Sequence, residues 1–297
     1  DVPSGYGFGK SIKLDCTTLD ATPTFTVLQQ KLEGQNLQLL KKGTANAESL
    51  TLSFWVKSVK TGTYICELRD YDNNRTISKA YTVDSGSTWE QKFLNFAGDT
   101  TGALDDDNAA SLAVTFFLAV SSTYSSGTLA TSWESRTNAN RAVGQVNLSD
   151  STSNDFWLTA VQLEVGEYTS STLPPFQHES YGDNLARCQR YFYQLDATGA
   201  GRFASGGWFT TTDADTIVFF PCKMRTTYSL GYSALADFNF TSHTASKVVT
   251  TLALDTSACL DSADVRIAVG SAGGVAGNYG LLIANSSSSK LQFNCEL

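Results

Sequence analysis

The sequence predicts an all-β protein, in which a jelly-roll β-sandwich is followed by a smaller C-terminal β-sandwich domain. Many short segments alternate apolar and polar residues with a period of two, as half-buried strands do. The composition also favours strands, because aromatic residues make up 11% of the 297 residues and glycine, a common turn residue, occurs 23 times. About seven to eight such segments within the first ~165 residues, separated by long polar loops, are typical of two packed sheets.

The clearest strand contains Leu52, Phe54 and Val56 on one face and Trp55 and Lys57 on the other. Turn residues follow several of the alternating segments, and they separate one strand from the next. In the first half, strands are expected at residues 10–16, 50–57, 63–70, 78–83, 89–96, 112–121 and 155–165. In the second half they are expected at residues 190–195, 202–210, 216–220, 228–233, 237–242, 247–254, 265–269, 279–284 and 290–296.

Two segments have helical character instead. Residues 25–40 carry leucines at partly helical spacing around Gly34, which predicts a short helix and loop. Asp183 is placed to cap a short helix at residues 184–188.

Pro174 and Pro175 cannot continue a strand, because proline lacks the N–H donor. We therefore expect a jelly-roll domain at residues 1–170, a connector at 171–190 and a C-terminal β domain at 191–297.

The net charge of −8 and the pI of about 4.8 predict an acidic surface that repels phosphate, so nucleic acid is not an expected partner. No apolar run approaches the length of about 18 residues that crosses a membrane, and membrane insertion is not expected. The chain begins at Asp1 without methionine or a signal peptide, from which we expect an interior fragment of a longer product.

The six cysteines are scattered and lack the paired spacing of zinc ligands. We expect reduced, buried thiols, which fits assembly in a reducing cytoplasm.

Catalytic chemistry is not indicated by the sequence. Its two histidines, His178 and His243, have no nearby histidine or cysteine that would complete a metal site, and no nucleophile elbow or phosphate-binding loop is present. We therefore expect a protein that is not an enzyme.

Clustered carboxylates are the remaining candidates for a metal site. Asp105, Asp106 and Asp107 are expected to form a solvated turn, with a structural calcium site as the alternative, because hard cations favour carboxylate and carbonyl oxygens. No other cofactor is expected.

Ligand binding is predicted at exposed aromatic and charged residues. Trp55 shares its strand face with Lys57 and points away from the predicted core, and Trp133 lies in a long loop beside Glu134 and Arg136. Exposed rings beside polar groups suit sugars, whose C–H faces stack on them. The alternative is that each tryptophan covers a sheet, packs under a loop or fills a subunit interface.

Six segments carry recognisable motifs: residues 50–58, 157–167, 175–177, 179–192, 220–225 and 293–297. The most specific is the connector with Cys188, Gln189 and Arg190, and together the motifs extend over most of residues 50 to 297. These segments resemble modular structural proteins of tailed-phage virions, of the tail-fibre or capsid-fibre type found in marine podoviruses and cyanophages.

This resemblance implies a virion location after assembly in the host cytoplasm, and homo-oligomers that are commonly trimers. It also implies contacts with other virion proteins, likeness to carbohydrate-binding jelly rolls, and a host-surface glycan as the ligand. It supplies no catalytic residue.

Three alternative functions remain open at this point. The first is a capsid decoration or stabilising protein without a receptor. The second is the carbohydrate-binding module of a secreted hydrolase. The third is a depolymerase-like tail spike, which would need two carboxylates about 5–10 Å apart in a pocket.

Overall fold

The structure is a computed structural model that describes residues 1–197, 199–243, 245–255 and 259–297. Strands make up most of its regular structure, which confirms the predicted all-β class. The chain forms two compact units, residues 1–177 together with Leu297, and residues 178–296. The expected connector, residues 171–190, contributes its first residues to the first unit and helix α2 to the second.

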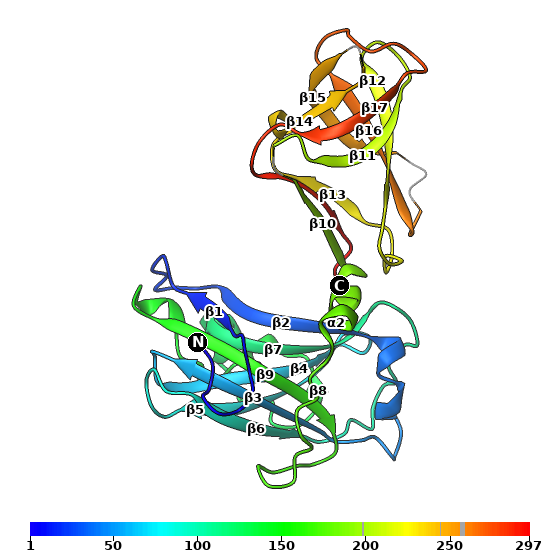
Figure 1. The fold of residues 1–297 in the computed structure, drawn as a ribbon. Coiled ribbons are helices and arrows are strands. Elements are labelled where there is room, and N and C mark those ends of the chain that lie inside the picture. Colours follow the sequence, from blue (N-terminus) through cyan, green and yellow to red (C-terminus); the bar gives the residue numbers. More distant parts are fainter. Residues whose placement is uncertain (198, 244, 256–258) are drawn as a thin grey trace. The chain divides into compact units, whose positions relative to one another are not determined.

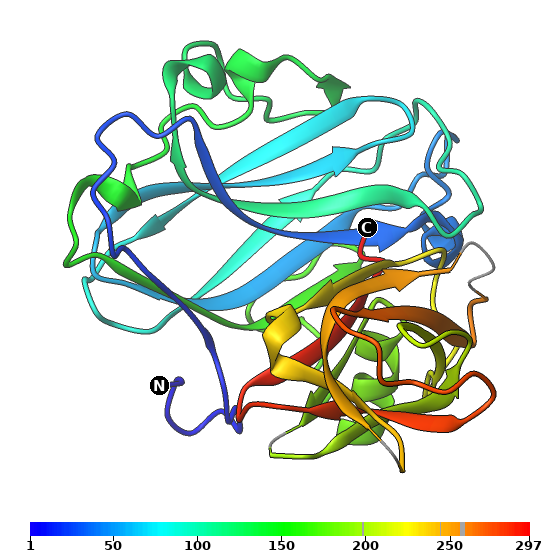
Figure 2. The ribbon, with the colours of Figure 1, turned by 90° about the horizontal axis from the view of Figure 1, so that it is seen from above.

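The first unit is a sandwich of two antiparallel sheets (Figures 1 and 2). One sheet has the strand order β1-β9-β3-β6, and the other has the order β2-β7-β4-β5-β8. The strands are β1 (Ile12–Asp15), β2 (Phe25–Glu33), β3 (Leu50–Ser58), β4 (Gly62–Asp70), β5 (Arg75–Val83), β6 (Glu90–Phe96), β7 (Ala110–Val120), β8 (Glu134–Ser135) and β9 (Asp155–Val165). A single helical turn, α1 (Ser122–Ser125), follows β7.

The strand order is that of a jelly roll. When the two-residue β8 is set aside, the first strand pairs with the last, the second with the seventh, the third with the sixth and the fourth with the fifth. This nested pairing rolls one long hairpin into two sheets, the arrangement found in viral capsid and lectin domains. The jelly roll predicted from the alternating pattern is therefore present.

The prediction of a short helix and loop at residues 25–40 is wrong. Residues Phe25–Glu33 form β2, and only short 3-10 turns, Gly34–Asn36 and Gln38–Leu40, follow it. The pairing of β2 with β7 shifts register twice, between Thr26 and Val27 and between Leu32 and Glu33. Each shift interrupts the period of two, so the apolar residues of this strand fall at spacings that resemble a helix.

The core of the first unit lies between its sheets. Phe54 on β3 contacts Tyr81 on β5 and Phe116 on β7 edge to face, at 5.0 Å between ring centroids in each case. These contacts join the two sheets directly, because β3 belongs to one sheet and β5 and β7 belong to the other. The inward-facing side chains of β3 are fully buried, as the alternation predicts.

The second unit contains a closed six-stranded barrel with the order β11-β12-β16-β15-β14-β17 (Figure 1). The prediction for this unit was a β-sandwich, whereas the strands close into a barrel. An alternating pattern predicts where strands lie, but it does not predict whether the two edge strands of a sheet will pair with each other. The strands are β11 (Arg202–Trp208), β12 (Asp213–Phe219), β14 (Phe238–Thr241), β15 (Ser246–Leu254), β16 (Ser262–Val269) and β17 (Tyr279–Ala284).

A separate three-stranded sheet, β10-β18-β13, accompanies the barrel in the second unit and consists of β10 (Phe192–Ala197), β13 (Ser229–Tyr232) and β18 (Ser289–Asn294). Helix α2 (Tyr181–Gln189) precedes it. The residue that caps α2 is Ser180, whose Oγ accepts from the N–H of Asp183, so the predicted cap at Asp183 is wrong. Ser180 suits this position because it precedes the first orphan N–H groups of the helix.

The cysteines agree only in part with the prediction. All six thiols are free, but only Cys66 and Cys295 are buried, whereas Cys188 and Cys259 are exposed. Burial raises the pKa of the Cys66 thiol, which keeps it protonated and unreactive. No helix in the described residues is both long and apolar enough to cross a membrane.

Candidate ligand-binding sites

Trp55 lies on the outer face of the four-stranded sheet, away from the core. Its ring is nevertheless only 9% exposed, because Tyr6 packs on it at 4.3 Å between centroids. Lys57, two residues along the same face, lies 4.1 Å from the ring of Trp157 and forms an ion pair with Asp1. The sequence therefore predicted the face correctly, but this face is covered.

Two chain segments cover that face, residues 1–10 and 166–177. Thr159 donates to the carbonyl of Lys10, and Thr51 accepts from the N–H of Tyr168. The segments meet where Phe8 and Phe176 form an edge-to-face pair at 5.2 Å. The entry and exit of the first unit therefore run side by side over its outer surface.

Trp133, Glu134 and Arg136 belong to the edge of the other sheet, at and beside β8. The indole of Trp133 donates to the carbonyl of Ala97 at 2.7 Å, and its ring packs against the core. Glu134 accepts from Asn140 at 2.9 Å. These three residues lie on a different sheet from Trp55, and the structure does not bring the four into one site.

Asp105, Asp106 and Asp107 are exposed in the loop before β7. The N–H of Asp105 donates to Asp72, and Asp107 accepts from the N–H of Ala109. Their carboxylates do not form a group of three with neighbouring oxygens among the described residues. This geometry is that of a turn, and a calcium site at this loop stays a prediction.

Buried charges in the first unit are paired. Lys42 lies 2.5 Å from Asp70 and 3.1 Å from Asp99, and Asp99 also accepts two hydrogen bonds from Arg75. Burial opposes ionisation of Asp99, but the hydrogen bonds from Arg75 and Lys42 outweigh it and lower its pKa. These contacts fasten the loops at one end of the sandwich.

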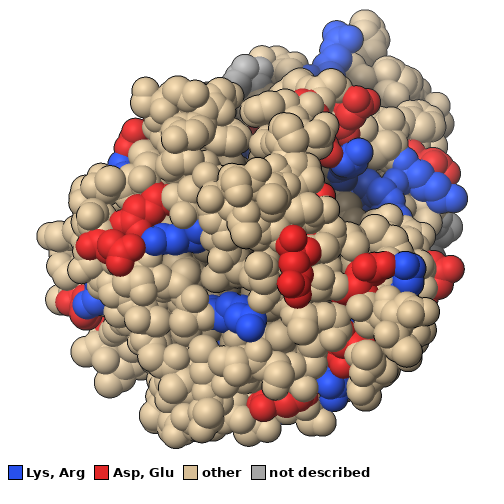
Figure 3. Space-filling view, turned by 90° about the horizontal axis from the view of Figure 1, so that it is seen from below, with Lys and Arg blue, Asp and Glu red and all other residues tan. Residues whose placement is uncertain are grey.

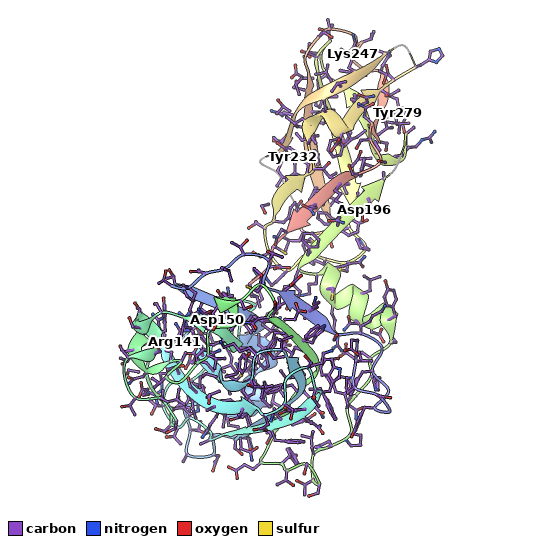
Figure 4. All side chains as sticks on the ribbon, turned by 90° about the vertical axis from the view of Figure 1, so that its left-hand side faces the viewer. Arg141, Asp150, Asp196, Tyr232, Lys247 and Tyr279 are labelled. Atoms are coloured by element: carbon purple, nitrogen blue, oxygen red, sulfur yellow. The ribbon has the colours of Figure 1, made fainter. Side chains whose placement is uncertain are left out.

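A second buried pair lies beneath the loop that follows α1. Arg141 forms a bidentate pair with Glu67, at 2.7 and 2.6 Å, and Glu67 is fully buried. Figure 4 labels Arg141 in this part of the first unit. Each buried charge in these two groups has an oppositely charged partner within hydrogen-bond distance. We therefore assign both groups a structural role.

In the barrel, three carboxylates form the one group of potential metal ligands among the described residues. The oxygens of Asp215, Asp255 and Asp264 lie within 4.8 Å of one another. Burial, and then the charge of Asp264, raises the pKa of Asp215; burial, and then the charge of Asp255, raises that of Asp264. Arg266 lies 3.6 Å from Asp215 and 3.2 Å from Asp255. The oxygens suit a hard cation, and Arg266 already supplies part of the positive charge.

An open pocket of about 520 Å³ lies beside this group. Its floor is Gly207, which is paired with Asp215 on β12 and with Tyr279 on β17. Residues directly opposite one another share a face of the sheet. The missing side chain of Gly207 therefore leaves a gap between Asp215 and Tyr279.

The pocket walls are aromatic and polar. Tyr279 is 63% exposed and Phe209 is 60% exposed, and Asn278 adds amide and carbonyl groups. Tyr279 lies on the outside of the barrel (Figure 4). Flat rings beside a carboxylate and an amide are the combination that binds sugars.

The neighbouring Gly206 is required for a different reason. A Cβ at Gly206 would lie 1.7 Å from the carbonyl oxygen of Asp215, so only glycine fits. At Gly207 a Cβ would meet only the carbonyl of Asn278 at 3.6 Å, an ordinary contact. Packing would therefore allow a larger residue at position 207. Because glycine has no side chain, the pocket stays open at this position.

No family model matches this chain, and no curated protein matches it in sequence. Among solved structures, a T=1 Penaeus vannamei nodavirus structure is 8% identical with a TM-score of 0.21, and each chain is covered to 96%. A red clover necrotic mosaic virus structure is 10% identical with a TM-score of 0.17, and each chain is covered to 97%.

Oxalate decarboxylase from Bacillus subtilis is also 10% identical, with a TM-score of 0.12, over 99% of this chain and 79% of that one. These TM-scores are too low to support an argument about fold or function. The fold assignment therefore rests on strand order and register.

Sequence reasoning missed the barrel pocket and the group of three aspartates. Their residues come from β11, β12, β16 and the segments beside β15 and β17, and only the barrel register brings them together. The one local signal was the run Gly206, Gly207, Trp208 and Phe209, in which two small residues precede two large rings.

Proposed function

We propose that this chain is a non-enzymatic structural protein of a tailed-phage virion, a tail or capsid fibre or appendage that contributes to attachment to host-surface glycans. The jelly-roll strand order supports the structural part, because viral capsid and lectin domains share this architecture. The sequence resemblance described above supports the phage assignment.

The observation that carries the attachment role is the open barrel pocket. Tyr279 and Phe209 expose their rings beside Asp215 and Asn278, on a closed barrel that holds them in place. A shallow site of this kind binds single sugars weakly. Oligomerisation into a trimer would multiply weak contacts into firm attachment.

Binding tests the attachment role. The purified 297-residue chain is applied to an array of bacterial surface polysaccharides and titrated with neutral hexoses. Tyr279→Ala should lower affinity roughly tenfold, which equals about 1.4 kcal/mol. Gly207→Val should lower it too, because the side chain occupies the pocket floor. Phe219→Ala is the matched control, since Phe219 is 75% exposed on the same barrel but does not line the pocket.

Equal binding by the wild type and both pocket variants would reject the pocket as the attachment site. The particle assignment is tested separately by immunogold labelling of virions and by light scattering of the purified chain. A trimeric mass supports a fibre. A chain on the capsid that binds no glycan would instead be a decoration protein.

A further inference from the structure

Lys42 is a buried lysine that contacts two buried carboxylates. Its side chain is 5% exposed, and those of Asp70 and Asp99 are 0% and 3% exposed. The Nζ of Lys42 lies 2.5 Å from an oxygen of Asp70 and 3.1 Å from an oxygen of Asp99. The neighbouring pair of Lys41 with Glu48 reaches solvent instead. On the face seen in Figure 3, too, acidic and basic side chains lie at the surface among uncharged ones.

The chemistry open to this group differs from that of the other buried pair, Arg141 with Glu67. A guanidinium stays charged, whereas a lysine amine that loses a proton becomes a nucleophile. In a dry interior, transfer of a proton from an ammonium to a carboxylate removes two charges that are costly to bury. The ring of Trp133 lies 5.4 Å from the Nζ of Lys42 and adds an apolar wall to the group.

The position of Asp70 suits attack at its carboxyl carbon. A C–O bond is about 1.2 Å long, so this carbon lies within about 3.7 Å of the Nζ of Lys42. Atoms held about 3–3.5 Å apart are placed to form a bond. The backbone N–H and the side-chain amide of Asn73 donate to the two oxygens of Asp70, at 2.9 and 3.0 Å. Such donors stabilise the negative charge that develops on a carboxyl oxygen during attack.

Asp99 provides a base in contact with the amine. Burial acts to raise the pKa of Asp99, but hydrogen bonds from Arg75 and Lys42 outweigh it and lower this pKa. The carboxylate is therefore ionised and can accept a proton. The Nζ of Lys42 also donates to the carbonyls of Thr101 and Gly102, at 3.0 and 2.9 Å, which hold the amine in place.

We propose that Lys42 and Asp70 react to form an intramolecular isopeptide bond, with Asp99 as the proton relay. The lone pair of Nζ forms a bond to the carboxyl carbon, and the bond from that carbon to one oxygen breaks with its electron pair. One proton passes directly across the hydrogen bond from Lys42 to Asp70. Asp99 carries a second proton from the nitrogen to the departing oxygen, which leaves as water. An ammonium and a carboxylate thus become an amide and water, and no further reactant is needed.

Asp70 is the expected reaction partner because Asp99 is engaged elsewhere. Arg75 donates to both oxygens of Asp99, which keeps this group as a carboxylate that repels a nucleophile. The new bond joins the loop before β3 to the end of β4, and these strands belong to opposite sheets. The sheets could then not separate at this end without breaking a covalent bond. The proposal does not depend on the attachment role.

Intact-mass spectrometry of the denatured 297-residue chain tests the proposal. The wild type should be about 18 Da lighter than the mass calculated from its sequence, because one water molecule is lost. Lys42→Arg keeps the positive charge but lacks the amine, so it should have the calculated mass. Lys41→Arg is the matched control at the adjacent, exposed lysine and should keep the deficit.

Asp99→Asn removes the proton relay. Bond formation should slow by about a hundredfold or more, so freshly purified variant should have the calculated mass. Digestion of the wild type and tandem mass spectrometry should yield a branched peptide that joins Lys42 to Asp70.

A salt bridge leaves the mass unchanged, so the calculated mass in the wild type would overturn the proposal. A deficit that persists in Lys42→Arg would place the loss of water elsewhere, as in a cyclic imide, and would overturn it as well. A branch at Asp99, or loss of ammonia through Asn73, would contradict the role given to Asp70.

Discussion

The jelly roll and the barrel treat buried charge in different ways. In the jelly roll, Glu67 and Asp99 each accept hydrogen bonds from an arginine. In the barrel, Asp215 and Asp264 each keep one buried oxygen without a hydrogen-bond partner in the described residues. The first arrangement fixes loops to a framework, whereas the second leaves electrostatic strain beside an open pocket. Strain of this kind is more common at binding sites than in scaffolds.

The largest expected effect is at the buried pair of the jelly roll. Arg141→Ala leaves the fully buried Glu67 without its cation, which should lower the free energy of unfolding by about 3–5 kcal/mol. Chemical denaturation followed by tryptophan fluorescence measures it. Arg202→Ala, an exposed substitution in the barrel, is the control and should change little. A decrease of less than about 1 kcal/mol in the free energy of unfolding would contradict a structural role for this pair.

Trp55 tests how firmly the outer face is closed. Trp55→Ala should lower the unfolding free energy by about 3 kcal/mol, the lower end of the range for buried tryptophan, because the ring is covered by Tyr6. Differential scanning calorimetry measures the shift. An unchanged melting temperature would indicate that the Trp55 ring contributes little to stability and is available to bind a ligand, as the sequence predicted.

The contact between Tyr6 and Trp55 should be energetically specific. A double-mutant cycle with Tyr6→Ala and Trp55→Ala should give a coupling free energy of about 0.5–1.5 kcal/mol, as measured for aromatic pairs. Tyr6→Phe is the control, because it keeps the ring. Additive losses would indicate that residues 1–10 lie on the face without contributing to its stability.

The smallest expected effect is a difference in pH dependence. The pKa of Asp264 is raised in the folded state, so the native state binds the extra proton and stability falls as pH rises from about 3.9 through the raised value. The pKa of Asp99 is lowered, so its contribution is present above about 3.9 and is lost as pH falls through the lowered value.

Asp264→Asn should therefore stabilise the barrel increasingly as pH rises to neutrality, whereas Asp99→Asn should destabilise the jelly roll most at neutral pH. Melting temperatures of both variants between pH 3 and pH 7 measure these trends. Parallel trends in the two variants would remove the contrast between the units.

Local alternation was sufficient to predict most strands. The strand with Leu52, Phe54 and Val56 was predicted within a residue, because one of its faces is buried over its whole length. Strand β2 was missed because two register shifts break its alternation, and such shifts depend on the partner strand β7. The closure of the barrel likewise depends on pairing between β11 and β17, which are far apart in the sequence.

The candidate sites were harder to predict for the same reason. The alternating pattern placed Trp55 on the correct face of its strand. It could not show that Tyr6, which is distant in the sequence, would cover the Trp55 ring. The barrel pocket depends on Asp215 and Tyr279 lying on either side of Gly207.

The pairing of β1 with β9 has an evolutionary consequence. The chain enters and leaves the jelly roll on one surface, where Phe8 meets Phe176. A module with neighbouring entry and exit points can be exchanged between genes, or spliced into a longer chain, while its sheets stay intact. Recombination that transfers such a cassette would give a lineage a new outer surface without requiring it to evolve a new fold.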